Sequence, residues 1–185
     1  MQTYAILQYL EDQQAWKIRF LGYDVYSTSW VTNAGLIHLW AGDITELRDH
    51  TKKVATFHNL KLIEPVSYEL FQEIYEWIEA FLNGSELSPP ISIFSLRFFP
   101  MYRKILEVPY GTVAHYSQLA RSFPDRMKLI KALRYNPFPP LIPCHRIVSK
   151  NSFPGQYTPL GEKFKLQLIQ KENRSKSVDN HTKRK

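Results

Sequence analysis

A single cysteine, Cys144, stands between a proline and a histidine in the segment Ile-Pro-Cys-His-Arg-Ile-Val, residues 142–148. The thiolate form of cysteine is a strong nucleophile, and a neighbouring base or cation increases its population at neutral pH. One interpretation of the pattern is therefore a reactive thiol beside a histidine. Many unpaired cysteines, however, are small buried side chains without chemistry, and adjacency in sequence does not fix hydrogen-bond geometry. The elements that surround the segment decide between these two interpretations.

The composition is that of a folded, soluble protein. The chain has 185 residues, of which 44% are hydrophobic, so it suits one domain or two small domains that share an interface. A single cysteine excludes an intramolecular disulfide and argues against a cysteine-based zinc site. No apolar run is long enough to span a membrane and no signal peptide is evident, so we expect a cytoplasmic protein, or a nuclear one in a eukaryote. His38, His50 and His58 lack a metal-ligand spacing, and we expect no metal site.

The first half of the chain has the pattern of strands followed by a helix. Segments rich in β-branched and aromatic residues, separated by glycine-containing turns, predict strands at residues 16–20, 25–31 and 36–40. Apolar residues then recur at spacings of three and four from Tyr68 to Leu82, which predicts a helix. We therefore expect an α/β N-terminal domain, a small sheet plus a helix, over residues 1–88, with a linker at 84–90.

The second half of the chain is mostly helical by its pattern. Periodicity and capping residues predict helices at residues 101–107, 116–121, 126–135 and 162–172. The second and third of these are separated by a break at 122–124, with Asp125 as the expected N-cap, and such a pair resembles a helix-turn-helix unit. We expect a mostly α C-terminal domain over residues 89–172 that carries this unit.

Basic residues are concentrated at two places. Lys128, Lys131 and Arg134 recur every three residues on the third predicted helix, which is equally compatible with a solvated face and with contacts to phosphate groups. Residues 173–185 carry five basic residues against Asp179, and we expect them to form a disordered basic tail. With a net charge of +7, the chain favours a polyanionic partner such as nucleic acid.

The order of short motifs is more specific than any one of them. From Phe98 to Glu172 the chain carries Val-Pro-Tyr-Gly-Thr-Val, His-Tyr-Ser-Gln-Leu-Ala, a basic helix, Asn-Pro-Phe-Pro, Ile-Pro-Cys-His-Arg-Ile-Val, Gly-Gln-Tyr-Thr and Lys-x-x-Leu-Ile-x-x-Glu. This order resembles the O6-alkylguanine-DNA alkyltransferases, also called methylated-DNA–protein-cysteine methyltransferases. The resemblance implies a DNA repair protein that acts on O6-alkylguanine in double-stranded DNA. It would move the alkyl group irreversibly to its own cysteine, as a monomer and without a cofactor.

The resemblance gives five residues a catalytic role. Cys144 would attack the alkyl carbon and keep it as a thioether, and the chain has no second cysteine to reverse the reaction. His145 would act as the base through a water molecule, with Glu172 orienting it. Tyr116 would donate to N3 of the departing guanine. Asn136 would hold the Pro-Cys-His-Arg segment through side-chain-to-backbone hydrogen bonds.

Other positions would bind the extruded base and the DNA. Ile147 matches the position whose carbonyl binds the guanine amino group, and Tyr157 and Thr158 match the loop that covers the flipped base. The residue aligned with the family's intercalating arginine is Met127, preceded by Arg126. We assign the intercalating role to Arg126, and Met127 as an apolar wedge is the alternative. Further DNA contacts would come from the basic residues of the same helix, namely Lys128, Lys131 and Arg134.

Three other functions compete with repair. A non-catalytic relative that binds alkylated DNA is one, but such relatives carry another residue in place of the cysteine. A transcription regulator that uses the helix-turn-helix would explain the charge, but it leaves the Pro-Cys-His-Arg segment and Glu172 without a purpose. A thiol hydrolase would need an oxyanion hole, and nothing in the sequence indicates one. A repair alkyltransferase therefore fits the chain best.

Overall fold

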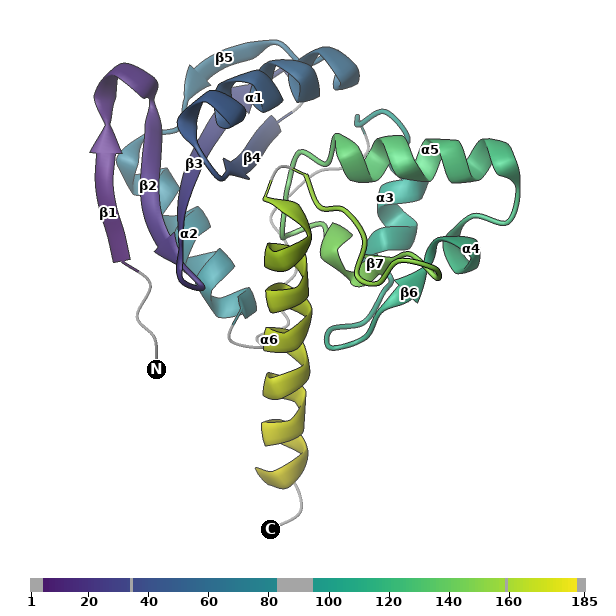
Figure 1. Cartoon of the computed structure of the whole chain (residues 1–185). Coiled ribbons are helices and arrows are strands. Elements are labelled where there is room, and N and C mark those ends of the chain that lie inside the picture. The colour runs from purple at the N-terminus through teal and green to yellow at the C-terminus, as the bar shows by residue number, and fades with distance from the viewer. Residues whose placement is uncertain (1–4, 34, 83–94, 159, 183–185) are drawn as a thin grey trace.

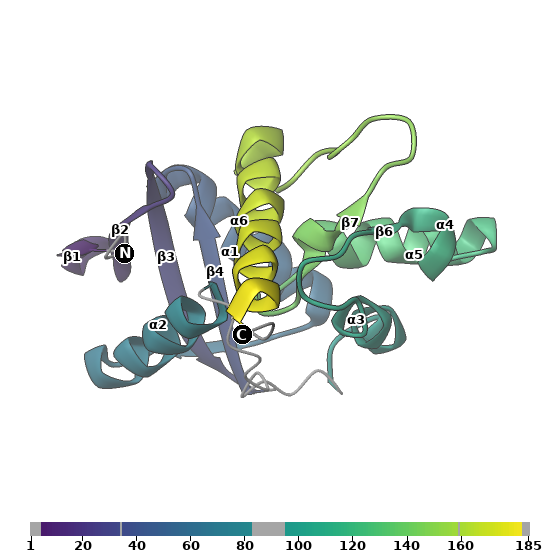
Figure 2. The ribbon, with the colours of Figure 1, turned by 90° about the horizontal axis from the view of Figure 1, so that it is seen from below.

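The computed structural model describes residues 5–182 apart from 34, 83–94 and 159, and it has two parts (Figure 1). The N-terminal half, residues 5–82, holds an antiparallel sheet with two helices, and the C-terminal half, residues 95–182, is mostly helical. Helix α6 lies between the sheet and helices α3, α4 and α5 in both views (Figures 1 and 2). The small sheet and the accompanying helices agree with the expectation from the sequence.

The N-terminal elements are β1 (Ala5–Leu10), a 3-10 turn (Glu11–Gln13), β2 (Ala15–Phe20), β3 (Tyr23–Thr32), β4 (Gly35–Ala41), α1 (Ile44–His58), β5 (Leu62–Pro65) and α2 (Tyr68–Leu82). The C-terminal elements are α3 (Phe99–Leu106), β6 (Ala114–His115), α4 (Tyr116–Leu119), α5 (Phe123–Arg134), a 3-10 turn (Cys144–Arg146), β7 (Ile147–Val148) and α6 (Gly161–Thr182).

Alternation of buried and exposed side chains explains the strands. Along β2, Trp16, Ile18 and Phe20 are buried whereas Arg19 is exposed, as expected where side chains alternate between the two faces of a strand. The sheet has the order β1-β2-β3-β4, and β5 pairs with the remaining part of β3. The three strands predicted from the sequence correspond to β2, β3 and β4, whereas β1 and β5 were not predicted.

Helix α1 was also not predicted, and its buried face shows why. Asp43 caps its N-terminus by accepting a main-chain hydrogen bond of 2.8 Å. The buried side chains mix apolar Leu47 and Val54 with polar His50 and His58. The apolar periodicity that reveals most helices is therefore weak here. Helix α2, by contrast, has the bounds that its strong periodicity predicts.

Helix α5 begins three residues before its predicted start. The N-cap is Ser122 and not Asp125, so the predicted cap was wrong. The Ser122 hydroxyl accepts from the Asp125 amide at 3.2 Å and donates to the Asp125 carboxylate at 2.8 Å. Pro124 lies in the first turn, where its missing N–H needs no partner, so it starts the helix instead of breaking it. Only residues 120–122 connect α4 to α5.

Helix α6 corrects the prediction for the C-terminus. It runs past the expected end at residue 172 to Thr182, so the prediction of a disordered tail was wrong for residues 173–182. Residues 183–185, the expected linker at 84–90 and the proposed boundary after residue 88 lie outside the described residues. No helix in the described part of the chain is both long enough and apolar enough to cross a membrane.

A hydrophobic core extends across both halves and includes Cys144. Phe164 of α6 packs against Phe20, Tyr23 and Trp40 of the sheet, with ring centroids 5.5 to 5.7 Å apart. Because this core contains side chains from both halves, the sheet supports the segment that carries the cysteine.

Candidate active site

Cys144 begins a 3-10 turn between Pro143 and strand β7, in the interior of the protein. Its side chain is only 6% exposed. The turn is followed at once by β7, which pairs in parallel with β6 so that Ala114 lies beside Ile147. Since α4 starts directly after β6, this pairing fixes the start of α4, with Tyr116, relative to the cysteine turn.

Asn136 contacts the sulfur directly. Its Nδ2 lies 3.0 Å from Cys144 Sγ and donates to the Ile142 carbonyl at 2.8 Å. Its Oδ1 accepts from the Phe138 amide at 3.0 Å. The side-chain-to-backbone bonds expected for Asn136 are present, and the contact with the sulfur is an additional feature. An amide donor at this position stabilises a negative charge on sulfur.

His145 and Arg146, which follow Cys144 in the turn, form a buried cluster with Glu172 of α6. His145 Nε2 lies 2.7 Å from Glu172 Oε1, and Arg146 donates to both oxygens of the same carboxylate at 3.0 to 3.2 Å. The Gly111 amide donates a further hydrogen bond of 3.0 Å to Glu172. Burial alone would raise the pKa of Glu172. The neighbouring His145 and Arg146 outweigh this effect and lower the pKa to about 2.

The ionised carboxylate fixes the tautomer of His145. A carboxylate only accepts hydrogen bonds, so Nε2 must carry the proton that it donates to Glu172. The ring nitrogen that can accept a proton is then Nδ1. Burial lowers the pKa of His145, and Glu172 partly opposes this effect. The arrangement has the chemistry of a histidine base oriented by a carboxylate.

Lys165 of α6 is a further buried side chain with a titratable group, and it was not predicted as a site residue from the sequence. Its Nζ donates to the Ile147 carbonyl at 2.6 Å. Burial lowers its pKa to about 8, and the proximity of Cys144 acts in the opposite direction. A sequence signal existed: Lys165 shares an apolar helix face with Ile169 and Glu172 at spacings of four and three. A lysine on such a face is unusual unless it has a buried partner.

The thiol is protonated at rest but has groups around it that favour the thiolate. Burial raises the pKa of Cys144, while Asn136, Lys165 and Tyr157 lower it in part. The Tyr157 hydroxyl lies next to both the thiol and Trp40 of β4, and burial with the nearby thiol raises its pKa well above the usual value. Tyr157 was expected in a loop that covers the site. It is buried, whereas its neighbour Thr158 is exposed.

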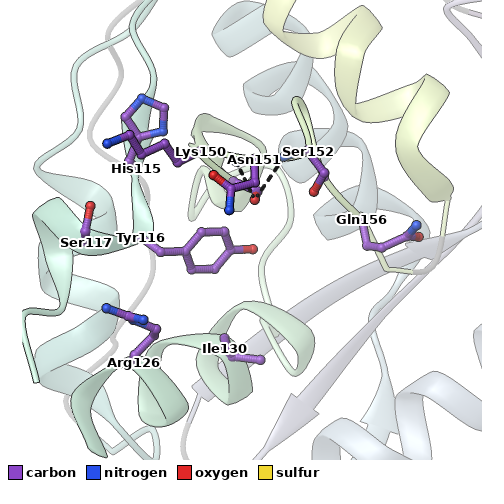
Figure 3. Close-up of a pocket in the computed structure, with 11 residues that line it drawn as sticks. His115, Tyr116, Ser117, Arg126, Ile130, Lys150, Asn151, Ser152 and Gln156 are labelled. Carbon is purple, nitrogen blue, oxygen red and sulfur yellow. Dashed lines mark hydrogen bonds between the residues drawn. The ribbon is translucent and has the colours of Figure 1, made fainter. Parts of the chain in front are cut away.

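An open pocket of about 560 Å³ lies on the surface around Tyr116. It is lined by residues of β6, α4, α5 and the loop after β7, namely His115, Tyr116, Ser117, Arg126, Ile130, Ser149, Lys150, Asn151, Ser152, Gly155 and Gln156. Figure 3 shows Tyr116 projecting between α5 and this loop. Burial raises the pKa of Tyr116, with a smaller contribution from Cys144.

The exposed face of α5 next to the pocket is unusually apolar. Phe123, Met127 and Ile130 are 72%, 40% and 41% exposed, and their spacing places them on one side of the helix. Arg126 lies among them and lines the pocket, whereas Met127 does not. Large exposed apolar side chains that gather in one place commonly mark an interaction site. The predicted basic residues of the same helix are also exposed, namely Lys128, Lys131 and Arg134.

The remaining predicted base contact is Ile147. It is fully buried, and its carbonyl accepts the hydrogen bond from Lys165, which leaves one lone pair of the oxygen for another donor. Within the described ranges, no three His, Cys, Asp or Glu side chains are grouped so that they could hold a metal ion.

Comparison with known proteins agrees with this geometry. Residues 100–174 match the family model described as 6-O-methylguanine DNA methyltransferase, DNA binding domain. A methylated-DNA–protein-cysteine methyltransferase of Saccharolobus islandicus is 28% identical over 106 residues, which is 55% of this chain and 69% of that protein. One from Archaeoglobus fulgidus is 33% identical over 86 residues, covering 44% and 57%.

The fold is also similar to a solved structure. The O6-methylguanine-DNA methyltransferase of Pyrococcus kodakaraensis superposes with a TM-score of 0.64 at 22% identity, covering 85% of this chain and 97% of that one. At this identity the likeness concerns the fold alone. Residues 100–174 are therefore similar to the O6-methylguanine-DNA methyltransferases, as the order of motifs around Pro-Cys-His-Arg predicted.

Proposed function

We propose that this protein repairs DNA by transferring the alkyl group of O6-alkylguanine irreversibly to Cys144 in a single turnover. The observation that carries the proposal is the contact of Cys144 Sγ with the Asn136 amide nitrogen at 3.0 Å, in a turn whose next residue, His145, pairs with Glu172 at 2.7 Å. A cysteine with a carboxylate-oriented histidine and an amide donor has the parts of an activated nucleophile. The match of residues 100–174 to the family model supports the same activity.

The proposed reaction begins with the thiol proton. His145 takes it at Nδ1, and Glu172 stabilises the resulting imidazolium, while Asn136 and Lys165 stabilise the thiolate. The thiolate sulfur attacks the alkyl carbon, a carbon–sulfur bond forms, and the bond between that carbon and O6 breaks. The electron pair of the broken bond moves into the purine, which makes N3 basic.

Tyr116 completes the proton balance. Its raised pKa keeps the hydroxyl protonated at neutral pH, so it can donate its proton to N3 and let guanine leave as a neutral base. The proton held on His145 then restores the tyrosine hydroxyl through solvent. The net change exchanges the thiol hydrogen for the alkyl group. The thioether is stable and the chain has no second thiol, so each molecule reacts once.

We further propose that α4 and α5 act as a helix-turn-helix on double-stranded DNA. The exposed apolar side chains of α5 would enter the groove, with Arg126 beside the gap left by the flipped nucleotide. Ile147, Tyr157 and Thr158 would contact the flipped base. The basic residues Lys128, Lys131 and Arg134 would contact phosphate groups, and such contacts make binding depend on salt. The protein would act as a monomer.

The test is the mass of the intact protein after incubation with a duplex that contains one O6-methylguanine. We expect a gain of one methyl group per molecule, located on the peptide with Cys144, and no gain for Cys144→Ala at equal binding. If the mass of the wild-type protein stays unchanged although it binds the lesion, the protein is a damage-recognition relative and the transfer proposal is wrong.

A further inference from the structure

The main chain on both sides of Asn136 is held by the N-terminal half. His58 Nε2, at the end of α1, lies 2.8 Å from the carbonyl oxygen of Tyr135. The His38 amide of β4 donates to the carbonyl oxygen of Pro137 at 3.0 Å. Strand β4 is at one end of the strand order, so this amide is on the side of β4 that faces away from β3. Asn136, which contacts the sulfur, lies between these two anchored carbonyls.

The hydrogen bonds of His58 define its tautomer. The Arg97 amide donates to Nδ1 at 3.1 Å, so Nδ1 carries no proton, and Nε2–H donates to Tyr135. Burial lowers the pKa of His58, which keeps this neutral form at physiological pH. Phe57 next to it stacks on the Tyr135 ring with centroids 4.4 Å apart. Both ring nitrogens of His58 therefore bond main-chain groups of the C-terminal half, and the Tyr102 hydroxyl of α3 lies 3.2 Å from Nε2 and 3.3 Å from the Tyr135 carbonyl oxygen.

We propose that α1 and β4 act as a clamp that positions Asn136 against the Cys144 sulfur, with His58 as the positioning residue. The clamp consists of the His58–Tyr135 and His38–Pro137 hydrogen bonds. This inference rests on the proposed function, because Asn136 matters there as the donor to the attacking sulfur. It gives the N-terminal half a role in the reaction rate in addition to its role in folding.

The physical reason is that the two anchored carbonyls belong to the residues on either side of Asn136, whose side chain contacts the sulfur. Asn136 uses its single amide group for two donor contacts and one acceptor contact, all within 3.0 Å. A shift of the main chain at residues 135–137 moves the amide away from at least one of them. Misplacement of a reacting group by about 1 Å lowers a rate by up to about a hundredfold. Loosening the clamp should therefore slow transfer while leaving the DNA-binding surface of α5 in place.

The experiment compares two substitutions of similar polarity at the clamp. Glutamine in His58→Gln places a donor near the position of Nε2 and keeps the bond to Tyr135. Asparagine in His58→Asn is too short to reach that carbonyl, although it can still accept from Arg97. His50→Asn is the matched control, because His50 is also buried on α1 and bonds to neither carbonyl. Each full-length protein is measured for single-turnover transfer rate at saturating duplex, for duplex affinity, and for free energy of unfolding.

We expect His58→Asn to slow transfer by roughly tenfold or more with affinity within about twofold, and His58→Gln to recover most of the rate. His50→Asn should lose stability without losing rate. If His58→Asn and His50→Asn both transfer at the wild-type rate, the clamp is wrong, because the substitution at His58 would then lower only the stability of the fold.

A second readout separates this inference from the proposed function. Carbamidomethylation of Cys144 by iodoacetamide over a range of pH reports the thiol pKa without any DNA. The clamp predicts a higher thiol pKa in His58→Asn than in His58→Gln, since Asn136 lowers it in the wild-type protein. If the wild-type protein transfers no methyl group but the two variants still differ in this way, the proposed function fails and the clamp stands. Identical pKa values in the two variants contradict the clamp.

Discussion

Replacement of Glu172 by glutamine should remove a large part of the acid sensitivity of folding. The carboxylate accepts hydrogen bonds from His145, Arg146 and the Gly111 amide, and its pKa in the folded protein is about 2, compared with an ordinary value of 4.5. At about 1.4 kcal/mol per pKa unit, this difference corresponds to about 3 kcal/mol of stability. Because the unfolded chain takes up the proton first, this stability is present above pH 4.5 and is lost as the pH falls toward 2.

The variant should therefore be less stable than the wild-type protein at neutral pH, and the gap should close in acid. Glu172→Gln leaves the buried Arg146 without a negative partner, so we expect a loss of about 3 to 5 kcal/mol at pH 7. Urea denaturation of both proteins at intervals between pH 7 and pH 2.5 measures the gap. Asp24→Asn is the control: Asp24 bonds Lys17 and Arg19 but its side chain is 38% exposed, so this change should have little effect at any pH.

A gap between wild type and Glu172→Gln that keeps its size down to pH 2.5 would refute the reasoning. It would mean that the carboxylate takes up its proton at the same pH in the folded and the unfolded protein. The contribution of the cluster to stability would then come from packing and from neutral hydrogen bonds. The side chain of Glu172 would not be held in its ionised form beside His145.

Two further predictions concern the thiol and the leaving guanine. Lys165→Met should raise the pKa of Cys144 and slow its carbamidomethylation by iodoacetamide near pH 8, since the buried ammonium lowers that pKa. Lys163→Met, at an exposed neighbouring position, should match the wild-type protein, and equal rates for both variants would exclude the role of Lys165. Tyr116→Phe should slow methyl transfer at saturating duplex by about a hundredfold with affinity within about twofold, and a loss confined to affinity would mean that the hydroxyl does not donate to N3.

The parts of the fold that the sequence predicted are those in which one physical signal dominates. Helix α2 has a strong apolar periodicity, and its two ends were predicted at the right residues. Helix α1 was missed because its buried side includes His50 and His58, whose partners lie in the other half of the chain. The predicted start of helix α5 is three residues too late because Pro124 suggests a break in the chain, although proline is well suited to the first turn of a helix.

The candidate site divides in the same way. Cys144, His145 and Asn136 are adjacent to each other in sequence or joined by one turn, so their grouping could be predicted from the motif. Lys165 comes from α6, which is distant from Asn136 in the sequence. Its place on an apolar helix face indicates burial, but only the fold shows that its ammonium group lies near the thiol. The direct contact of Asn136 with sulfur likewise depends on how the main chain turns between residues 136 and 144.

The depth at which Cys144 lies has a consequence for the lifetime of the protein. A molecule that works once is lost if its sulfur reacts with anything else, such as a peroxide, a small disulfide or a free alkylating agent. Such reagents attack exposed thiolates, whereas this thiol is 6% exposed and burial raises its pKa. On the proposed function, the folded protein therefore keeps its thiol unreacted until an alkylated base is brought to the sulfur.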